Sequence, residues 1–159
     1  MVDTAGVSLP TTASRSIDVA APPEAVYDIV SDVTRTGEWS PECRSCDWID
    51  QPGQIGSRFK GHNKSGPARW TTTAEVLAAE RPNRFGFATL FKDGHSTRWT
   101  YEMVPNRDGT TLTESFEHVD APLFIKLAER LFIRNRQEQL ENGMDETLAK
   151  IKVLAERSA

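Results

Sequence analysis

The sequence predicts an α+β fold in which a curved antiparallel sheet of about seven strands packs against one long C-terminal helix. Short segments rich in Trp, Phe, Thr and Val, separated by turn signals, fill residues 43–118, and apolar residues at helical spacing follow Pro122. Because no helical segment separates the strands, a parallel βαβ architecture is excluded. We expect residues 1–12 to form a flexible tail and residues 13–159 to form a single domain.

The N-terminal part predicts a strand followed by two short helices. Ser14–Ala20 alternates as a strand does, and the strand ends at Pro22 and Pro23. Proline suits the first turn of a helix, so Glu24–Ser31 is predicted to be helical. Asp32–Trp39 is predicted to form a second short helix, which ends before the next proline because that step disfavours helical angles.

The rest of the chain predicts a strand meander and then the long helix. Strands are expected near residues 43–50, 56–63, 68–79, 84–91, 96–104 and 110–118. The apolar stripe of the helix consists of Leu123, Leu127, Leu131, Leu140, Met144, Leu148, Ile151 and Leu154. A stripe of this size has to be buried, so the helix is expected to lie on the sheet or on a partner.

Charge and composition argue against several functional classes. A net charge of -4 and a pI near 5.4 argue against a nucleic-acid surface. The N-terminus does not resemble a signal peptide and no run of eighteen apolar residues occurs, so we expect a cytoplasmic protein without integral membrane association.

The two cysteines, Cys43 and Cys46, are expected to be reduced thiols. Three scattered histidines do not complete a zinc site, so neither a metal nor a cofactor is predicted. On a regular strand the odd separation of the cysteines would point them to opposite faces.

The order of these elements, together with local motifs, resembles the START-like SRPBCC superfamily of the polyketide cyclase/dehydrase and lipid transport type. The matching segments are Ala21–Val30, Ser31–Val33, Gly37–Pro41, Gly56–Phe59, Trp99–Tyr101 and Gly109–Phe116, within a match that spans about residues 14–155. The resemblance implies a helix-grip fold and a cavity for a hydrophobic small molecule, such as a lipid or polyketide, between sheet and helix. It implies no shared catalytic triad.

Period-two alternation predicts which side chains face the space beneath the helix. The alternative is that these aromatic residues simply fill a core. Phe87 faces inward beside Trp99 only if the turn near Asp93 is longer than two residues. The predicted ligand-binding residues are Phe59, Asn63, Trp70, Phe85, Phe87, Trp99, Tyr101, Glu114 and Phe116 on strands, with Leu123, Leu127 and Leu131 on the helix; Thr72, Val76, Met103 and Leu112 are predicted to face the same way.

Tyr101 and Glu114 are the candidate catalytic pair. If they face each other across the hairpin at residues 106–109, burial would raise the pKa of Glu114 and make it a possible acid or base. A purely structural hydrogen bond, or a buried pair between Glu114 and an arginine, is the alternative. His118, at a strand end, is expected to be exposed.

Three functions remain open from the sequence. The first is binding of a hydrophobic small molecule, the second is a polyketide aromatase/cyclase or dehydratase activity, and the third is protein interaction through the C-terminal helix. Whether the chain is an enzyme, which ligand it takes and its oligomeric state do not follow from the sequence.

Overall fold

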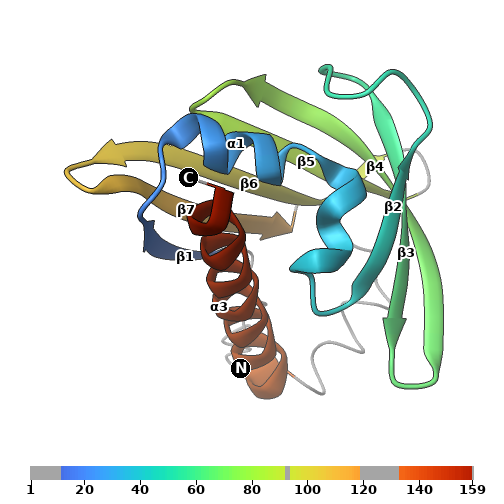
Figure 1. Ribbon diagram of the computed structural model, residues 1–159. Helices are drawn as coiled ribbons and strands as arrows, with labels where there is room; N and C mark the ends of the chain where they lie inside the picture. The colour runs from blue at the N-terminus through green and yellow to red at the C-terminus, as the bar shows by residue number, and fades with distance from the viewer. Residues whose placement is uncertain (1–11, 92–93, 119–132, 159) are drawn as a thin grey trace, which may run out of the picture.

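The computed structural model describes residues 12–91, 94–118 and 133–158 and contains one antiparallel sheet (Figure 1). The strand order is β1-β7-β6-β5-β4-β3-β2, so that β1 and β2 form the two edges. This arrangement confirms the predicted α+β fold. The strands are β1 (Thr12–Val19), β2 (Cys43–Trp48), β3 (Arg58–Ser65), β4 (Ala68–Glu80), β5 (Arg84–Phe91), β6 (Gly94–Asn106) and β7 (Gly109–His118).

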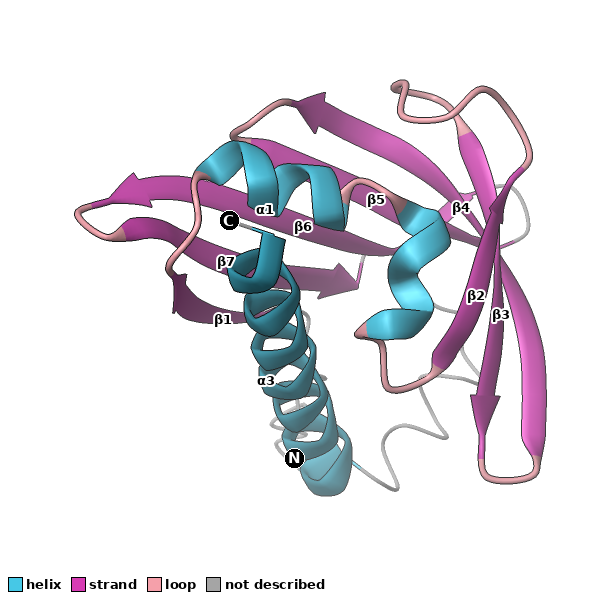
Figure 2. Ribbon diagram, in the orientation of Figure 1, coloured by secondary structure: helices cyan, strands magenta, loops and turns pink. Residues whose placement is uncertain are grey.

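The helices lie on one side of the sheet (Figure 2). They are α1 (Pro23–Val30), the 3₁₀ helix η1 (Val33–Glu38) and α3 (Ile133–Ser158). α1 packs on the central strands β5, β6 and β7, η1 packs on β2, and α3 packs on β1, β7 and α1. None of the helices in the described ranges is long and apolar enough to cross a membrane.

Local chemistry explains the two N-terminal helices. Pro22 is extended and Pro23 begins α1. Proline fits this position because the N–H groups of the first helical turn have no intrahelical partner, so the missing N–H costs no hydrogen bond. The carboxylate of Asp32 then caps η1 by accepting a hydrogen bond from the Thr34 N–H at 3.2 Å. The second predicted helix therefore exists, as a 3₁₀ helix.

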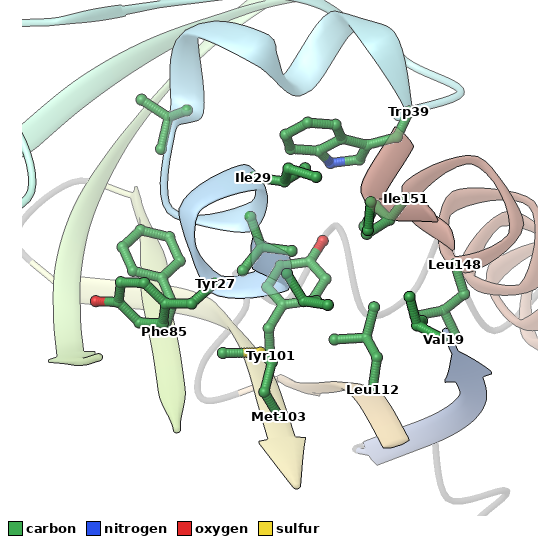
Figure 3. Packing of buried hydrophobic residues seen from close by; sticks show 14 of the residues in the cluster. Val19, Tyr27, Ile29, Trp39, Phe85, Tyr101, Met103, Leu112, Leu148 and Ile151 are labelled. Carbon is green, nitrogen blue, oxygen red and sulfur yellow. The ribbon is translucent and has the colours of Figure 1, made fainter. Parts of the chain in front are cut away.

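The core lies where α1 and the C-terminal half of α3 meet the sheet (Figure 3). Val26 of α1, Phe85 of β5 and Leu112 of β7 are completely buried. On α3 the buried apolar residues follow at helical spacing: Met144, Leu148, Ile151 and Ala155. Each large apolar side chain buried here contributes about 1.5–3 kcal/mol before entropy is subtracted. Of the predicted apolar stripe, Met144, Leu148 and Ile151 are thus buried and Leu140 and Leu154 are half-buried, whereas Leu123, Leu127 and Leu131 lie outside the described residues.

The register between β5 and β6 decides which aromatic residues face inward together. Phe87 lies opposite Trp99, as predicted, but the reason differs from the expected longer turn. Phe91 pairs with Gly94, and the register shifts inside the strands, between Thr89 and Leu90. A β-bulge places one extra residue in one of two paired strands and so offsets the pairing beyond it by one position. Here that offset brings Phe87 opposite Trp99.

Candidate functional site

A cavity of about 310 Å³ lies between the sheet and the helices, among the residues that the structure describes. Walls come from η1, from strands β2 to β7 and from the start of the described part of α3. Most of the lining is apolar. The lining residues include Val30, Val33, Thr36, Trp39, Cys43, Cys46, Phe59, Gly61, Asn63, Trp70, Thr72, Ala74, Phe87, Thr89, Thr97, Trp99, Tyr101, Glu114, Phe116, His118, Leu140, Gly143, Met144 and Thr147.

Eight of the predicted ligand-binding side chains line this cavity: Phe59, Asn63, Trp70, Phe87, Trp99, Tyr101, Glu114 and Phe116. Phe85 does not. It is fully buried in the core and meets the ring of Tyr27 edge to face, with the ring centroids 6.3 Å apart. Alternation alone assigns Phe85 and Phe87 to the same face, but α1 covers the part of that face where Phe85 lies. Val76, Met103 and Leu112 are buried in the same core cluster.

Two aromatic pairs lie side by side on the sheet wall of the cavity, since Phe87 of one pair is the register partner of Trp99 of the other. Phe59 of β3 meets Phe87 of β5 with the ring centroids 5.2 Å apart, and Trp99 of β6 meets Phe116 of β7 at 5.5 Å. Trp70 is 39% exposed, so it lies where the cavity meets the surface. These rings offer a broad apolar wall to a ligand.

Tyr101 and Glu114 are direct neighbours in the β6–β7 register, as predicted. The Tyr101 hydroxyl donates a hydrogen bond to Oε1 of Glu114 at 3.0 Å, and both side chains are buried. Figure 3 shows the Tyr101 ring rising from the sheet toward Trp39. The second carboxyl oxygen, Oε2 of Glu114, is buried and has no hydrogen-bond partner among the described residues. A buried polar atom without a partner is unfavourable unless a bound molecule satisfies it.

Burial controls the protonation of this pair. It raises the pKa of Glu114 to about 8, an effect that the hydrogen bond from Tyr101 opposes and the nearby charge of Asp145 reinforces. Burial and the adjacent Glu114 also raise the pKa of Tyr101 well above its ordinary value. Glu114 therefore carries a proton at neutral pH and can donate a hydrogen bond, while the phenol stays neutral.

The arginine nearest in register, Arg15 of β1, does not neutralise Glu114. Arg15 and Glu114 are Cα partners, but the Arg15 guanidinium pairs with Asp145 of α3 at 3.1 Å. Among the side chains that the structure describes, Glu114 forms no ion pair, so no buried arginine–glutamate pair is seen there. The carboxyl instead keeps one hydrogen bond, from Tyr101.

Sequence reasoning missed several lining residues, above all the two cysteines. The β2–β3 register shifts between Cys43 and Ser45, so Arg44 has no partner in the pairing. This irregularity brings Cys43 and Cys46 to the same side, contrary to the expected opposite faces, and both line the cavity. Their Sγ atoms lie 3.3 Å apart. The sequence carries no signal for a bulge at this place.

His118 also differs from its prediction, because it is half-buried and lines the cavity. Its Nδ1 atom and the Thr97 hydroxyl are 3.1 Å apart, and its ring meets Phe116 edge to face. Within the described residues, no group of three or more His, Cys, Asp or Glu side chains is placed to hold a metal ion.

Comparisons with known proteins agree with this architecture. The sequence profile described as polyketide cyclase / dehydrase and lipid transport matches residues 10–156. A polyketide-cyclase-like protein from Corynebacterium glutamicum, Cgl2372, is 36% identical, with a TM-score of 0.64 and 89% of each chain covered. No curated protein matches the sequence.

Two enzymes share the fold at low identity. The Zhui aromatase/cyclase from Streptomyces sp. R1128 has a TM-score of 0.72 and 17% identity, covering 92% of this chain and 93% of that one. The di-domain aromatase/cyclase StfQ of the steffimycin biosynthetic pathway has a TM-score of 0.75 and 14% identity, and covers 93% of this chain but 51% of its own. The profile match over nearly the whole sequence, on a seven-stranded sheet with a C-terminal helix, shows that the chain belongs to the polyketide cyclase / dehydrase and lipid transport family.

Proposed function

We propose that the protein binds a hydrophobic small molecule that carries a hydrogen-bond acceptor, such as a carbonyl oxygen. One observation carries the proposal: an aromatic-walled cavity contains a buried carboxyl group, Glu114, whose Oε2 atom has no partner in the part of the chain that the structure describes. The cavity volume of about 310 Å³ lies at the lower end of the range for ligand pockets.

The chemistry of the lining narrows the ligand class. Because the pKa of Glu114 is raised to about 8, its carboxyl group is a neutral donor near pH 7 and favours an uncharged acceptor over a carboxylate or phosphate. The aromatic pairs Phe59–Phe87 and Trp99–Phe116 in the lining favour a largely apolar body. A polyketide-derived or other lipid-like ketone has both properties.

Binding is expected to be measurable with the neutral dye Nile red, which carries a carbonyl group and brightens in apolar surroundings. Trp99→Ala removes one aromatic wall and should weaken dye binding about tenfold or more. Phe85→Leu is the matched control, because Phe85 is a buried aromatic residue that does not itself line the cavity. Absence of dye brightening, of a rise in Tm and of any ligand in native mass spectra would contradict the proposal.

Substitutions of Glu114 separate the roles of hydrogen bonding and shape. Glu114→Gln keeps a donor and should retain dye binding, whereas Glu114→Leu has similar bulk without a donor and should weaken it several-fold. Equal dye affinities of the two variants would exclude a role for the Glu114 hydrogen bond in recognition.

A second candidate is cyclisation or dehydration of a poly-ketone, favoured by the 3.0 Å contact between Tyr101 and Glu114. Ionised Glu114 would take a proton from the carbon between two ketones, while the Tyr101 hydroxyl would stabilise the oxygen of the resulting enolate. Two proteins of the same fold are aromatase/cyclases.

If Glu114 is the base, its pKa of about 8 fixes the pH dependence. Turnover of a poly-ketone mimic should rise about tenfold per pH unit below that value and level off above it. Glu114→Gln should lower the rate about 10²- to 10⁴-fold without loss of dye binding. An unchanged rate in this variant would exclude the acid–base role and leave the binding function standing.

The described helix α3 does not support the third hypothesis, protein interaction through the C-terminal helix. Met144, Leu148, Ile151 and Ala155 are already buried against the same chain, so this part of the stripe is not free to contact a partner.

A further inference from the structure

Cys43 and Cys46 form a close thiol pair in the wall of the cavity. Their Sγ atoms are 3.3 Å apart and both side chains are buried from bulk solvent, but both border the cavity space. The pair exists because Arg44 is skipped in the β2–β3 register, which turns the two cysteines to the same side. Separation by two residues and contact of the sulfur atoms are the geometry from which a disulfide can close with little backbone movement.

Neighbouring residues leave space for the two sulfur atoms. Gly61 of β3 is the register partner of Cys46, and a Cβ atom added at Gly61 would lie 3.6 Å from Sγ of Cys46 and 3.7 Å from Sγ of Cys43. Both thiols therefore face a residue without a side chain. Among the described strands β2 is also an edge strand, paired only with β3, so its backbone can adjust without breaking a second strand pairing.

The two thiols differ in their hydrogen bonding. The contact between the two sulfur atoms lowers the pKa of Cys43, whereas the same contact and burial raise the pKa of Cys46. One sulfur is thus favoured as the thiolate nucleophile and the other retains the proton. A metal role is not supported, since the described residues place no third ligand beside the pair.

We propose that Cys43 and Cys46 are a redox-active dithiol that closes to a disulfide when a hydroperoxide enters the cavity. The Cys43 thiolate attacks the peroxide and becomes a sulfenic acid, while the peroxide is reduced to water or an alcohol. The Cys46 thiol then attacks the Cys43 sulfur, forming the S–S bond and releasing water. Two thiols are oxidised by two electrons and one peroxide is reduced. This proposal is independent of the ligand that fills the cavity.

The test uses the full chain, hydrogen peroxide and intact-mass spectrometry. The wild-type protein should lose two hydrogen atoms, regain them with dithiothreitol and resist the sulfenic-acid reagent dimedone, because the second thiol reacts first. Cys46→Ser should accumulate a dimedone adduct at Cys43. Cys43→Ser should react with peroxide at least about tenfold more slowly, since it lacks the favoured nucleophile.

Folding of each variant is checked by circular dichroism before oxidation. If a variant fails to fold, peptide mapping of the oxidised wild-type protein decides the question through a cross-linked peptide joining residues 43 and 46. Three results would overturn the proposal: independent oxidation of the two thiols to sulfinic acids, equal reactivity of both single variants, or no reaction under conditions that oxidise free cysteine.

Discussion

Glu114→Gln is expected to abolish a fall in stability that the wild-type protein shows between about pH 4.5 and pH 8. The pKa of Glu114 rises from an ordinary 4.5 to about 8 on folding, because its carboxyl group is buried. The folded state therefore holds this proton more tightly than the unfolded state, and its stabilisation is complete below pH 4.5. Above pH 4.5 the unfolded state loses this proton first, so the free energy of unfolding declines until the pH has passed the folded-state pKa of about 8. Relative to low pH, the decline is about 3 kcal/mol at pH 7 and about 5 kcal/mol near pH 9.

Urea unfolding across this pH range measures the effect. The difference in unfolding free energy between Glu114→Gln and wild type should grow with pH by those amounts. Glu117→Gln, on the exposed face of the same strand, is the matched control and should follow the wild-type profile. Parallel profiles for wild type and Glu114→Gln would show that Glu114 is not protonated in the folded protein at neutral pH.

Gly37→Ala is expected to destabilise the fold by about 3 kcal/mol or more and to disturb the cavity wall. A Cβ atom at Gly37 would lie 2.2 Å from the carbonyl oxygen of Arg44 and 3.0 Å from its carbonyl carbon. These are backbone atoms, which cannot rotate away as a side chain can. Helix η1 and strand β2 would have to separate, moving Trp39 and Cys43 with them.

The effect is measured as a lower urea midpoint together with weaker Nile red binding. Gly94→Ala provides the comparison, because a Cβ atom there meets nothing within 4 Å. Equal stabilities of the two alanine variants would mean that η1 and β2 can separate without loss, and the tight contact would not be what holds this wall in place.

Short-range patterns in the sequence predicted the sheet and the centre of the site. Alternation along β6 and β7, with a turn at Asn106–Gly109, aligned Tyr101 with Glu114, since the register of a hairpin follows from its turn. The apolar stripe of α3 predicted the buried positions Met144, Leu148 and Ile151 for the same reason, because helical spacing is local.

Features that depend on contacts between distant segments were not predictable. The shared facing of Cys43 and Cys46 depends on the skipped Arg44, whose carbonyl group lies against Gly37 of a different element. Phe85 and Phe87 have the same alternation, and only the position of α1 over the sheet separates core from cavity. A single sequence gives the periodicity of a strand but not the element that covers it.

The pairing of β1 with β7 determines when the sheet can be completed during biosynthesis. Ser14 and Ser115 are partners although they are 101 residues apart, whereas β2 through β7 each neighbour the strand that follows or precedes them in the chain. During translation the first strand leaves the ribosome long before its partner has been made. The hairpins between them can form as they emerge, but this long-range closure has to wait for β7, so completing that edge is expected to be the late and slow event of folding.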